Sequence, residues 1–165
     1  MSEHVSHTLA PIFNPQSKVL MLGTMPSPKS REVGFYYGHP QNKFWKVMSD
    51  LFQEEIPQTI EEKEAFLYRH HIALWDVLQS CDIKGADDST IKNPVPNDLS
   101  VILEDAPIQA IFTTGAKAFQ LYKKHIYPKT QIEAKQLPST SPANCRFYKY
   151  EDILQHYEVV KKYLD

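Results

Sequence analysis

Cysteine is scarce in this sequence, and its scarcity excludes several kinds of site. The 165 residues include only Cys81 and Cys145, which are too few for a disulfide framework or for a four-cysteine zinc or iron–sulfur site. Among the histidines, His70 and His71 are adjacent, so on a helix they would point in different directions and could not pair on one metal ion. We therefore expect neither a metal nor another cofactor.

Long apolar runs are also missing. Residues 1–10 are polar, with no basic segment followed by an apolar run, and no later stretch approaches the ~20 apolar residues that a membrane helix needs. These features predict a cytoplasmic protein with no membrane partner. They also predict a flexible start over residues 1–10.

Neither sign of charge is in large excess. The formal net charge of −2 argues against a broad, charge-driven coating of nucleic acid, although it permits a small local basic patch. The length fits one domain, residues 1–165, which would bury roughly two thirds of the surface of its unfolded form.

Apolar runs alternate with helical patterns along the chain. Short apolar runs predict four strands, the last of them the weakest, at residues 18–22, 72–75, 110–113 and 131–137. Apolar spacing or a Thr-x-x-Glu capping box predicts helices at residues 44–52, 59–71, 116–126 and 151–164, with a short one near 97–104. Apart from that short helix, residues 76–109 read as a polar, proline-containing connection. This alternation predicts an α/β fold, a three-layer α/β/α sandwich around a central, mostly parallel four-stranded sheet.

Ligands of such folds bind beyond the carboxyl ends of the strands. In this chain those ends carry residues 23–27, Asp76, residues 113–115 and residues 137–144. A further unusual string, Tyr-Tyr-Gly-His-Pro-Gln-Asn, precedes the first long helix. Candidate site residues therefore gather at one edge of the predicted sheet, namely Gly23, Thr24, Pro26, Ser27, Tyr36, Tyr37, His39, Asn42 and Asp76.

Each candidate also has a purely structural interpretation. Residues 23–27 could be only a turn, and Asn42 could be a helix N-cap, a role that is compatible with chemistry. Tyr36 and Tyr37 could be core aromatics or a wall for a flat ligand. His39 could be a satisfied loop histidine. Asp76 could be tied to backbone amides or aimed into the site.

The segment 137–144 is rich in short hydroxyl side chains. It could be a plain hydrophilic loop, but hydroxyl groups and free backbone amides also make good phosphate contacts on DNA. On this interpretation the DNA-binding residues are Ser139, Thr140, Ser141 and Asn144.

Four strings of this sequence together resemble the hypoxanthine-DNA glycosylase family of the uracil-DNA glycosylase superfamily. They are Gly-Thr-Met-Pro-Ser at 23–27, Tyr-Tyr-Gly-His-Pro-Gln-Asn-Lys-Phe-Trp at 36–45, Leu-Trp-Asp-Val-Leu at 74–78 and residues 137–144. The second is the most specific, and the resemblance runs from about Pro11 to the last helix. It implies a central parallel sheet between helices and the removal of deaminated bases from DNA.

The resemblance also implies roles for individual residues. The first loop offers Thr24, Met25 and Ser27 where other families of the superfamily carry a water-handling Asp or Asn, and the position that matches the catalytic amide of the hypoxanthine family is Asn42. The string Thr-Thr-Gly at 113–115 departs from the Asn that we expect before this glycine, which leaves the contacts of that loop in doubt.

The mechanism that the resemblance implies begins when the damaged nucleotide is flipped out of the duplex. Tyr36 or Tyr37 would stack on the base, and the amides near Gly23 would bind its polar edge. Asp76 would accept the N1–H of hypoxanthine and repel adenine, whose N1 is an acceptor. Guanine also presents an N1–H, so its exocyclic amine would have to be excluded sterically. The amide oxygen of Asn42 would orient a water beneath an oxocarbenium-like sugar.

No lysine is placed by motif for Schiff-base chemistry, so this interpretation predicts a monofunctional glycosylase whose partner is damaged DNA, and such a domain can act as a monomer. Three alternatives stay open. The chain could be a glycosylase for uracil or for G:T and G:U mismatches, or a catalytically inactive module that binds nucleobases or damaged DNA. A small-molecule hydrolase ranks last because no Gly-x-Ser-x-Gly elbow or placed Cys-His pair is present.

Overall fold

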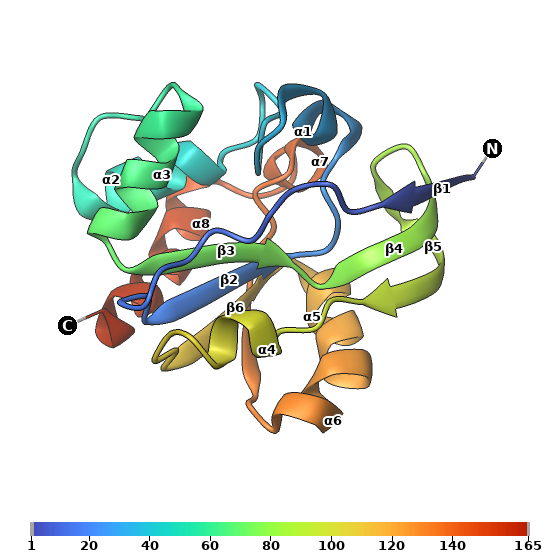
Figure 1. The fold of residues 1–165 in the computed structure, drawn as a ribbon. Helices are drawn as coiled ribbons and strands as arrows, with labels where there is room; N and C mark the ends of the chain where they lie inside the picture. The colour runs from blue at the N-terminus through green and yellow to red at the C-terminus, as the bar shows by residue number, and fades with distance from the viewer. Residues whose placement is uncertain (1, 165) are drawn as a thin grey trace.

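A four-stranded parallel sheet forms the centre of the computed structural model, which describes residues 2–164 (Figure 1). The strand order is β3-β2-β6-β7, with β2 at Val19–Gly23, β3 at Ile72–Asp76, β6 at Ala110–Thr114 and β7 at Ala134–Leu137. Strands β2 and β6 are buried along their whole length, which explains their continuous apolar sequences. The predicted sheet is confirmed, with strand boundaries that differ by a few residues.

Helices cover both faces of this sheet, which completes the predicted three-layer sandwich (Figure 1). Alternate residues of β2 point to opposite faces, and Met21 and Leu22 belong to different apolar clusters. The Met21 cluster is formed with α2 (Phe44–Phe52), α3 (Ile60–Arg69) and α8 (Tyr150–Tyr157). The Leu22 cluster is formed with α4 (Ser100–Leu103), α5 (Ala116–Leu121) and the π-helical turn Tyr122–Ile126.

The predicted helices are found, with changes at their ends. Helix α2 has the predicted bounds, whereas the helix predicted at 116–126 continues through the π-helical turn into α6 (Tyr127–Thr130). Gln131 then takes a left-handed φ of 58° and ends it, so β7 begins later than predicted. The last helix changes to 3₁₀ geometry over Glu158–Tyr163.

The capping box that predicted α3 is present. The hydroxyl of Thr59 accepts a hydrogen bond from the Glu62 amide, and the Glu62 carboxylate accepts one from the Thr59 amide. Thr59→Ala removes the first of these, so we expect a loss of about 1 kcal/mol in the free energy of unfolding. Chemical denaturation measures this loss, and any enzymatic activity should stay unchanged because α3 lies away from the strand ends that carry the site.

A second, antiparallel sheet corrects the prediction for two segments. Its order is β1-β4-β5, with β1 at Glu3–Ser6, β4 at Leu78–Lys84 and β5 at Asp87–Pro96. The connection over 76–109 is therefore largely a hairpin, and residues 3–6 form a strand where we expected a flexible start; Met1 lies outside the described residues. Register shifts along β4 and β5 break the period-two alternation that identifies a strand.

Two short helices lie in the loops that follow the central strands, α1 (Pro28–Val33) after β2 and α7 (Pro142–Cys145) after β7. The small sheet shares the apolar cluster of Leu22, through Val5, Leu78 and Ile83. Within residues 2–164, no helix is long and apolar enough to cross a membrane.

Candidate functional site

A cleft of about 740 Å³ opens at the carboxyl ends of the parallel strands. It brings together nearly all the residues that the sequence singled out, namely Gly23, Thr24, Pro26, Ser27, Tyr36, Tyr37, His39, Asn42, Asp76, Ser139, Thr140 and Ser141. Asn144 does not line the cleft, since its Nδ2 donates to the Ser139 carbonyl oxygen at 2.7 Å. The strand-end loops thus converge as the fold class requires.

Asn42 joins the start of α2 to the loop that follows β7. Its Oδ1 accepts one hydrogen bond from the Phe44 amide and another from the Thr140 hydroxyl, both 2.8 Å long. Asn42 therefore binds the first amide of α2 without being its N-cap, which is Lys43. Thr140, which is 1% exposed, is committed to Asn42 and not free for phosphate. With Oδ1 occupied by two donors, the Nδ2 group is the part of the Asn42 amide that remains for a ligand in the cleft.

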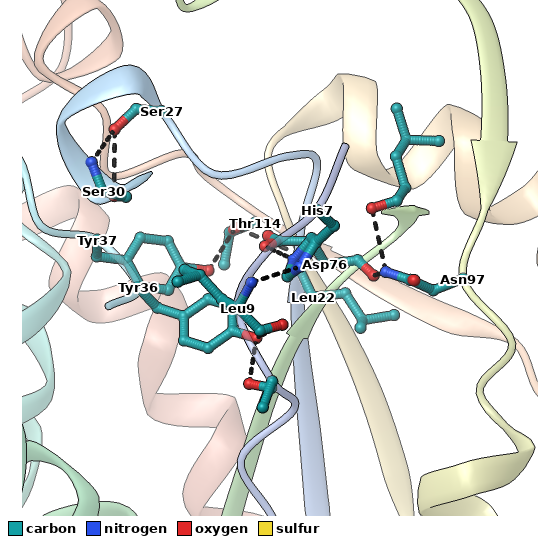
Figure 2. Close-up of polar contacts among 12 residues, drawn as sticks. His7, Leu9, Leu22, Ser27, Ser30, Tyr36, Tyr37, Asp76, Asn97 and Thr114 are labelled. Carbon is teal, nitrogen blue, oxygen red and sulfur yellow. Dashed lines mark hydrogen bonds and ion pairs between the residues drawn. The ribbon is translucent and has the colours of Figure 1, made fainter. Parts of the chain in front are cut away.

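The two adjacent tyrosines have different roles. Tyr36 is a core residue, 3% exposed, and its hydroxyl donates to the Ala10 carbonyl oxygen at 2.7 Å. Tyr37 adopts a left-handed φ of 54°, which is uncommon for a bulky residue. Its ring stacks on Phe44 with centroids 3.9 Å apart. Its hydroxyl shares a 3.1 Å hydrogen bond with Thr114, as Figure 2 shows. Burial, reinforced by the Asp76 carboxylate, raises the pKa of Tyr37, so this phenol stays protonated.

Asp76 ends β3 with a side chain that is only 6% exposed. Its Oδ2 bonds to His7 Nε2 at 2.8 Å (Figure 2). Its Oδ1 lies over Gly23, where a Cβ added to the glycine would come within 2.6 Å. The same position on Gly23 is 3.3 Å from the Tyr37 hydroxyl oxygen. Asn97 holds the backbone here by donating to the Asp76 carbonyl oxygen at 2.9 Å. The side chain is therefore held by a histidine and not by backbone amides.

Two other candidates shape the loops. Ser27 is the N-cap of α1, and its hydroxyl accepts from the Ser30 amide at 3.1 Å (Figure 2). His39 Nδ1 accepts from the Gln41 amide at 3.0 Å, as expected for a satisfied loop histidine. Both line the cleft through what remains of their surface.

The loop after β7 is held by its own hydroxyl groups. Ser139 Oγ accepts from the Ser141 amide at 3.1 Å, and Ser141 caps α7. At Gly115, whose φ is 102°, a Cβ would lie 3.3 Å from the Ser139 Cβ. The close packing of these two loops keeps Ser139 and Ser141 at the rim of the cleft.

The sequence did not point to several further residues of the cleft. The tip of the β4–β5 hairpin, residues 83–89, forms one wall. Thr114, from a strand end that the sequence did place at this edge, contributes its hydroxyl. Desolvation raises the pKa of Asp88 in this wall, although the Thr24 hydroxyl opposes the shift. Among residues 2–164, no group of three or more His, Cys, Asp or Glu side chains could hold a metal ion. A signal for the hairpin was present in Lys84-Gly85, because Gly85 takes the left-handed φ of 59° that a tight turn uses.

Comparison with known proteins identifies the family of this chain. Residues 10–165 match the family model of the uracil DNA glycosylase superfamily. A hypoxanthine DNA glycosylase of Methanosarcina acetivorans is 32% identical over 88% of this chain and 95% of its own. One from Methanosarcina barkeri is 30% identical over 84% and 88%.

A solved structure gives the same result. The solution NMR structure of a protein assigned as a uracil DNA glycosylase, also from Methanosarcina acetivorans, superposes with a TM-score of 0.82. The two sequences are 31% identical, and the match covers 96% of this chain and 98% of that one. By sequence and by fold, this chain belongs to the uracil DNA glycosylase superfamily and is a DNA glycosylase.

Proposed function

We propose that this glycosylase removes hypoxanthine from deoxyinosine in DNA. The observation that carries the proposal is the Asp76 carboxylate, held in the cleft with Oδ1 over Gly23. A carboxylate there accepts the N1–H of hypoxanthine, whereas adenine presents an acceptor at N1 and is rejected. The two relatives named as hypoxanthine DNA glycosylases support this choice of base.

Tyr37 is the better candidate for stacking on the flipped base. Tyr36 is packed in the core, while Tyr37 is half-buried in the cleft wall and uses one ring face against Phe44. A flat purine can stack on the other face of that ring. The phenol, whose pKa burial raises, remains available as a hydrogen-bond donor.

In the proposed chemistry, Asn42 holds the attacking water. The N-glycosidic bond breaks as the base leaves with the bonding electrons, which produces an oxocarbenium-like sugar, so the water needs positioning more than activation. The water then adds to C1′, and the proton that it loses passes to the departing base or to solvent. Because Oδ1 of Asn42 accepts hydrogen bonds from Phe44 and Thr140, its Nδ2 group donates to the water. In this proposal Nδ2 takes the role that our sequence-based prediction gave to the amide oxygen. Thr140 thereby acts as a positioning residue for Asn42. Backbone amides and hydroxyls of Ser139 and Ser141, at the rim, contact DNA phosphates.

The proposed activity is monofunctional, without strand cleavage. Lys84 is among the residues that line the cleft, but it lies exposed at the tip of the β4–β5 hairpin, and no motif places it for Schiff-base chemistry. Incubation of the enzyme with a deoxyinosine duplex and borohydride should therefore trap no covalent complex. We also propose that the enzyme acts as a monomer in the cytoplasm, where its free thiols, Cys81 and Cys145, would stay reduced.

Base release from a duplex with a single deoxyinosine tests the proposal. We expect free hypoxanthine to appear and the strand to break only after alkali treatment, which cleaves abasic sites. Tight binding to this duplex without any free base would identify the protein as a damage-binding module. Strand breakage without alkali would contradict the monofunctional assignment.

Gly23→Ala should damage the site without changing its chemistry. The new Cβ would meet Asp76 Oδ1 at 2.6 Å, and that carboxylate cannot retreat freely because its other oxygen is bound to His7. Overpacking of this kind costs about 1–3 kcal/mol of folding stability. Because Asp76 is also displaced from its reading position, we expect hypoxanthine release to slow about 10-fold, which corresponds to about 1.4 kcal/mol in the activation barrier. Single-turnover kinetics and a thermal melt measure the two effects. An unchanged rate would show that Asp76 need not stay over Gly23.

A further inference from the structure

His7 lies before the part of the chain that matches the superfamily model, which begins at residue 10. Its side chain is nevertheless 3% exposed and packs against Tyr36 and Trp75, with ring centroids 6.1 and 6.3 Å away. The residue follows β1, and its backbone amide donates to the Gln79 carbonyl oxygen at 2.6 Å. The pairing of β1 in the small sheet therefore places the buried His7 imidazole at the carboxyl end of β3.

The hydrogen bonds of His7 define where its proton lies (Figure 2). The backbone amide of Leu9 donates to Nδ1 at 3.2 Å, so Nδ1 is an acceptor and carries no proton. The single proton of the neutral ring then lies on Nε2, which donates to Asp76 Oδ2 at 2.8 Å. His7 is thus a neutral donor to the carboxylate and not its counter-ion.

This arrangement imposes a direction on the side chain at position 76. Oδ2 of Asp76 faces the Nε2–H donor of His7, so the other terminal atom of the side chain, Oδ1, must face Gly23 and the Tyr37 hydroxyl. For aspartate that other atom is an acceptor. For an amide in the same place, the oxygen would have to face His7, and the NH₂ group would face the cleft.

We propose that His7 is a positioning residue for base recognition, because its Nε2–H binds Oδ2 of Asp76 and so holds Oδ1 where it can read the purine. The proposal rests on the proposed function, in which Asp76 accepts the N1–H of hypoxanthine. It adds a residue from the N-terminal strand that does not touch the substrate. Its effect on base release is exerted only through Asp76.

A double-mutant comparison tests this role, because His7→Leu should slow hypoxanthine release in the wild-type background and speed it in the Asp76→Asn background. In the wild-type background, His7→Leu frees the carboxylate to rotate, and we expect hypoxanthine release to slow about 10-fold, the cost of one lost hydrogen bond to a charged group. In the Asp76→Asn background, the same His7→Leu change lets the amide turn its oxygen into the cleft. There we expect hypoxanthine release to rise above that of Asp76→Asn alone.

His7→Gln is the matched control, because its side-chain amide can still donate to Asp76, and it should keep more activity than His7→Leu. If His7 matters only for packing, His7→Leu will slow release in both backgrounds, and that result would overturn the inference. A wild-type enzyme that releases no hypoxanthine would instead overturn the proposed function.

A measurement on the folded wild-type protein does not depend on variants that fold poorly. Long-range ¹H–¹⁵N NMR of the imidazole reports which ring nitrogen is protonated. We expect Nε2 to be protonated and Nδ1 bare at neutral pH. A protonated Nδ1 would contradict the assigned direction of the hydrogen bond and with it the proposal.

Discussion

Replacement of Asn42 by alanine is expected to slow hypoxanthine release by about 100-fold or more, the usual cost of removing one polar group that acts in the transition state. Asn42 connects the two halves of the cleft, because Oδ1 accepts from Phe44 at the start of α2 and from Thr140 after β7. Its Nδ2 group is left to hold the water that attacks the sugar. Single-turnover kinetics on a deoxyinosine duplex, with binding measured in parallel, gives the effect on the chemical step.

Asn42 also binds the first amide of α2, so the catalytic loss must be separated from a loss of stability. Asn42→Asp is the matched variant, since one carboxylate oxygen can accept both hydrogen bonds while the other takes the place of Nδ2 and binds water. We expect it to melt near the wild-type temperature and to release base faster than Asn42→Ala. Retention of most of the excision rate in Asn42→Ala would rule out Asn42 as the catalytic residue.

Asp76→Asn should also reduce hypoxanthine release by about 100-fold or more, because the NH₂ group turned toward the cleft meets the N1–H donor of the base. The change is nearly isosteric, so packing around Trp75 and Gly23 is preserved. The loss of rate therefore measures the effect of replacing the acceptor that faces N1–H of hypoxanthine with a donor. It is measured as the single-turnover rate at saturating enzyme.

Asp82→Asn provides the control for this substitution. Asp82 lies in β4, outside the residues that line the cleft, and its carboxylate bonds to His4 and Asn93. We expect hypoxanthine release by this variant to match the wild type. Equal rates for Asp76→Asn and the wild type would mean that Asp76 does not read the base.

The sequence was sufficient to predict the central sheet and its helices, because these elements follow local rules. Strands buried on both faces, such as β2, are continuous apolar runs, and α3 is marked by its capping box. The antiparallel sheet was not predicted, because the bulges along β4 disrupt the alternation of buried and exposed residues that identifies a strand. Strand β1 depends on pairing with residues about eighty positions away, Glu3 with Ile83 for example, and four mostly exposed residues carry no local signal for that pairing.

The site could be predicted as a set of residues but not as a set of contacts. The rule that ligands bind at strand ends, together with the unusual strings, located most of the cleft lining. It could not show that Tyr36 is buried while Tyr37 faces the cleft, because that difference depends on the left-handed φ of Tyr37. Nor could it find His7, whose role depends on the unexpected strand before it.

The most direct test of the proposed base specificity is the ratio of two single-turnover rates, one for base release from a duplex with deoxyinosine and one from the same duplex with deoxyuridine. Asp76 can accept the N1–H of hypoxanthine or the N3–H of uracil, so the preference depends on ring size. We predict that hypoxanthine is released well ahead of uracil, because the larger purine ring covers more of Tyr37 and because two relatives are named as hypoxanthine DNA glycosylases. Faster release of uracil would contradict this specificity and would assign the enzyme to uracil or mismatch repair.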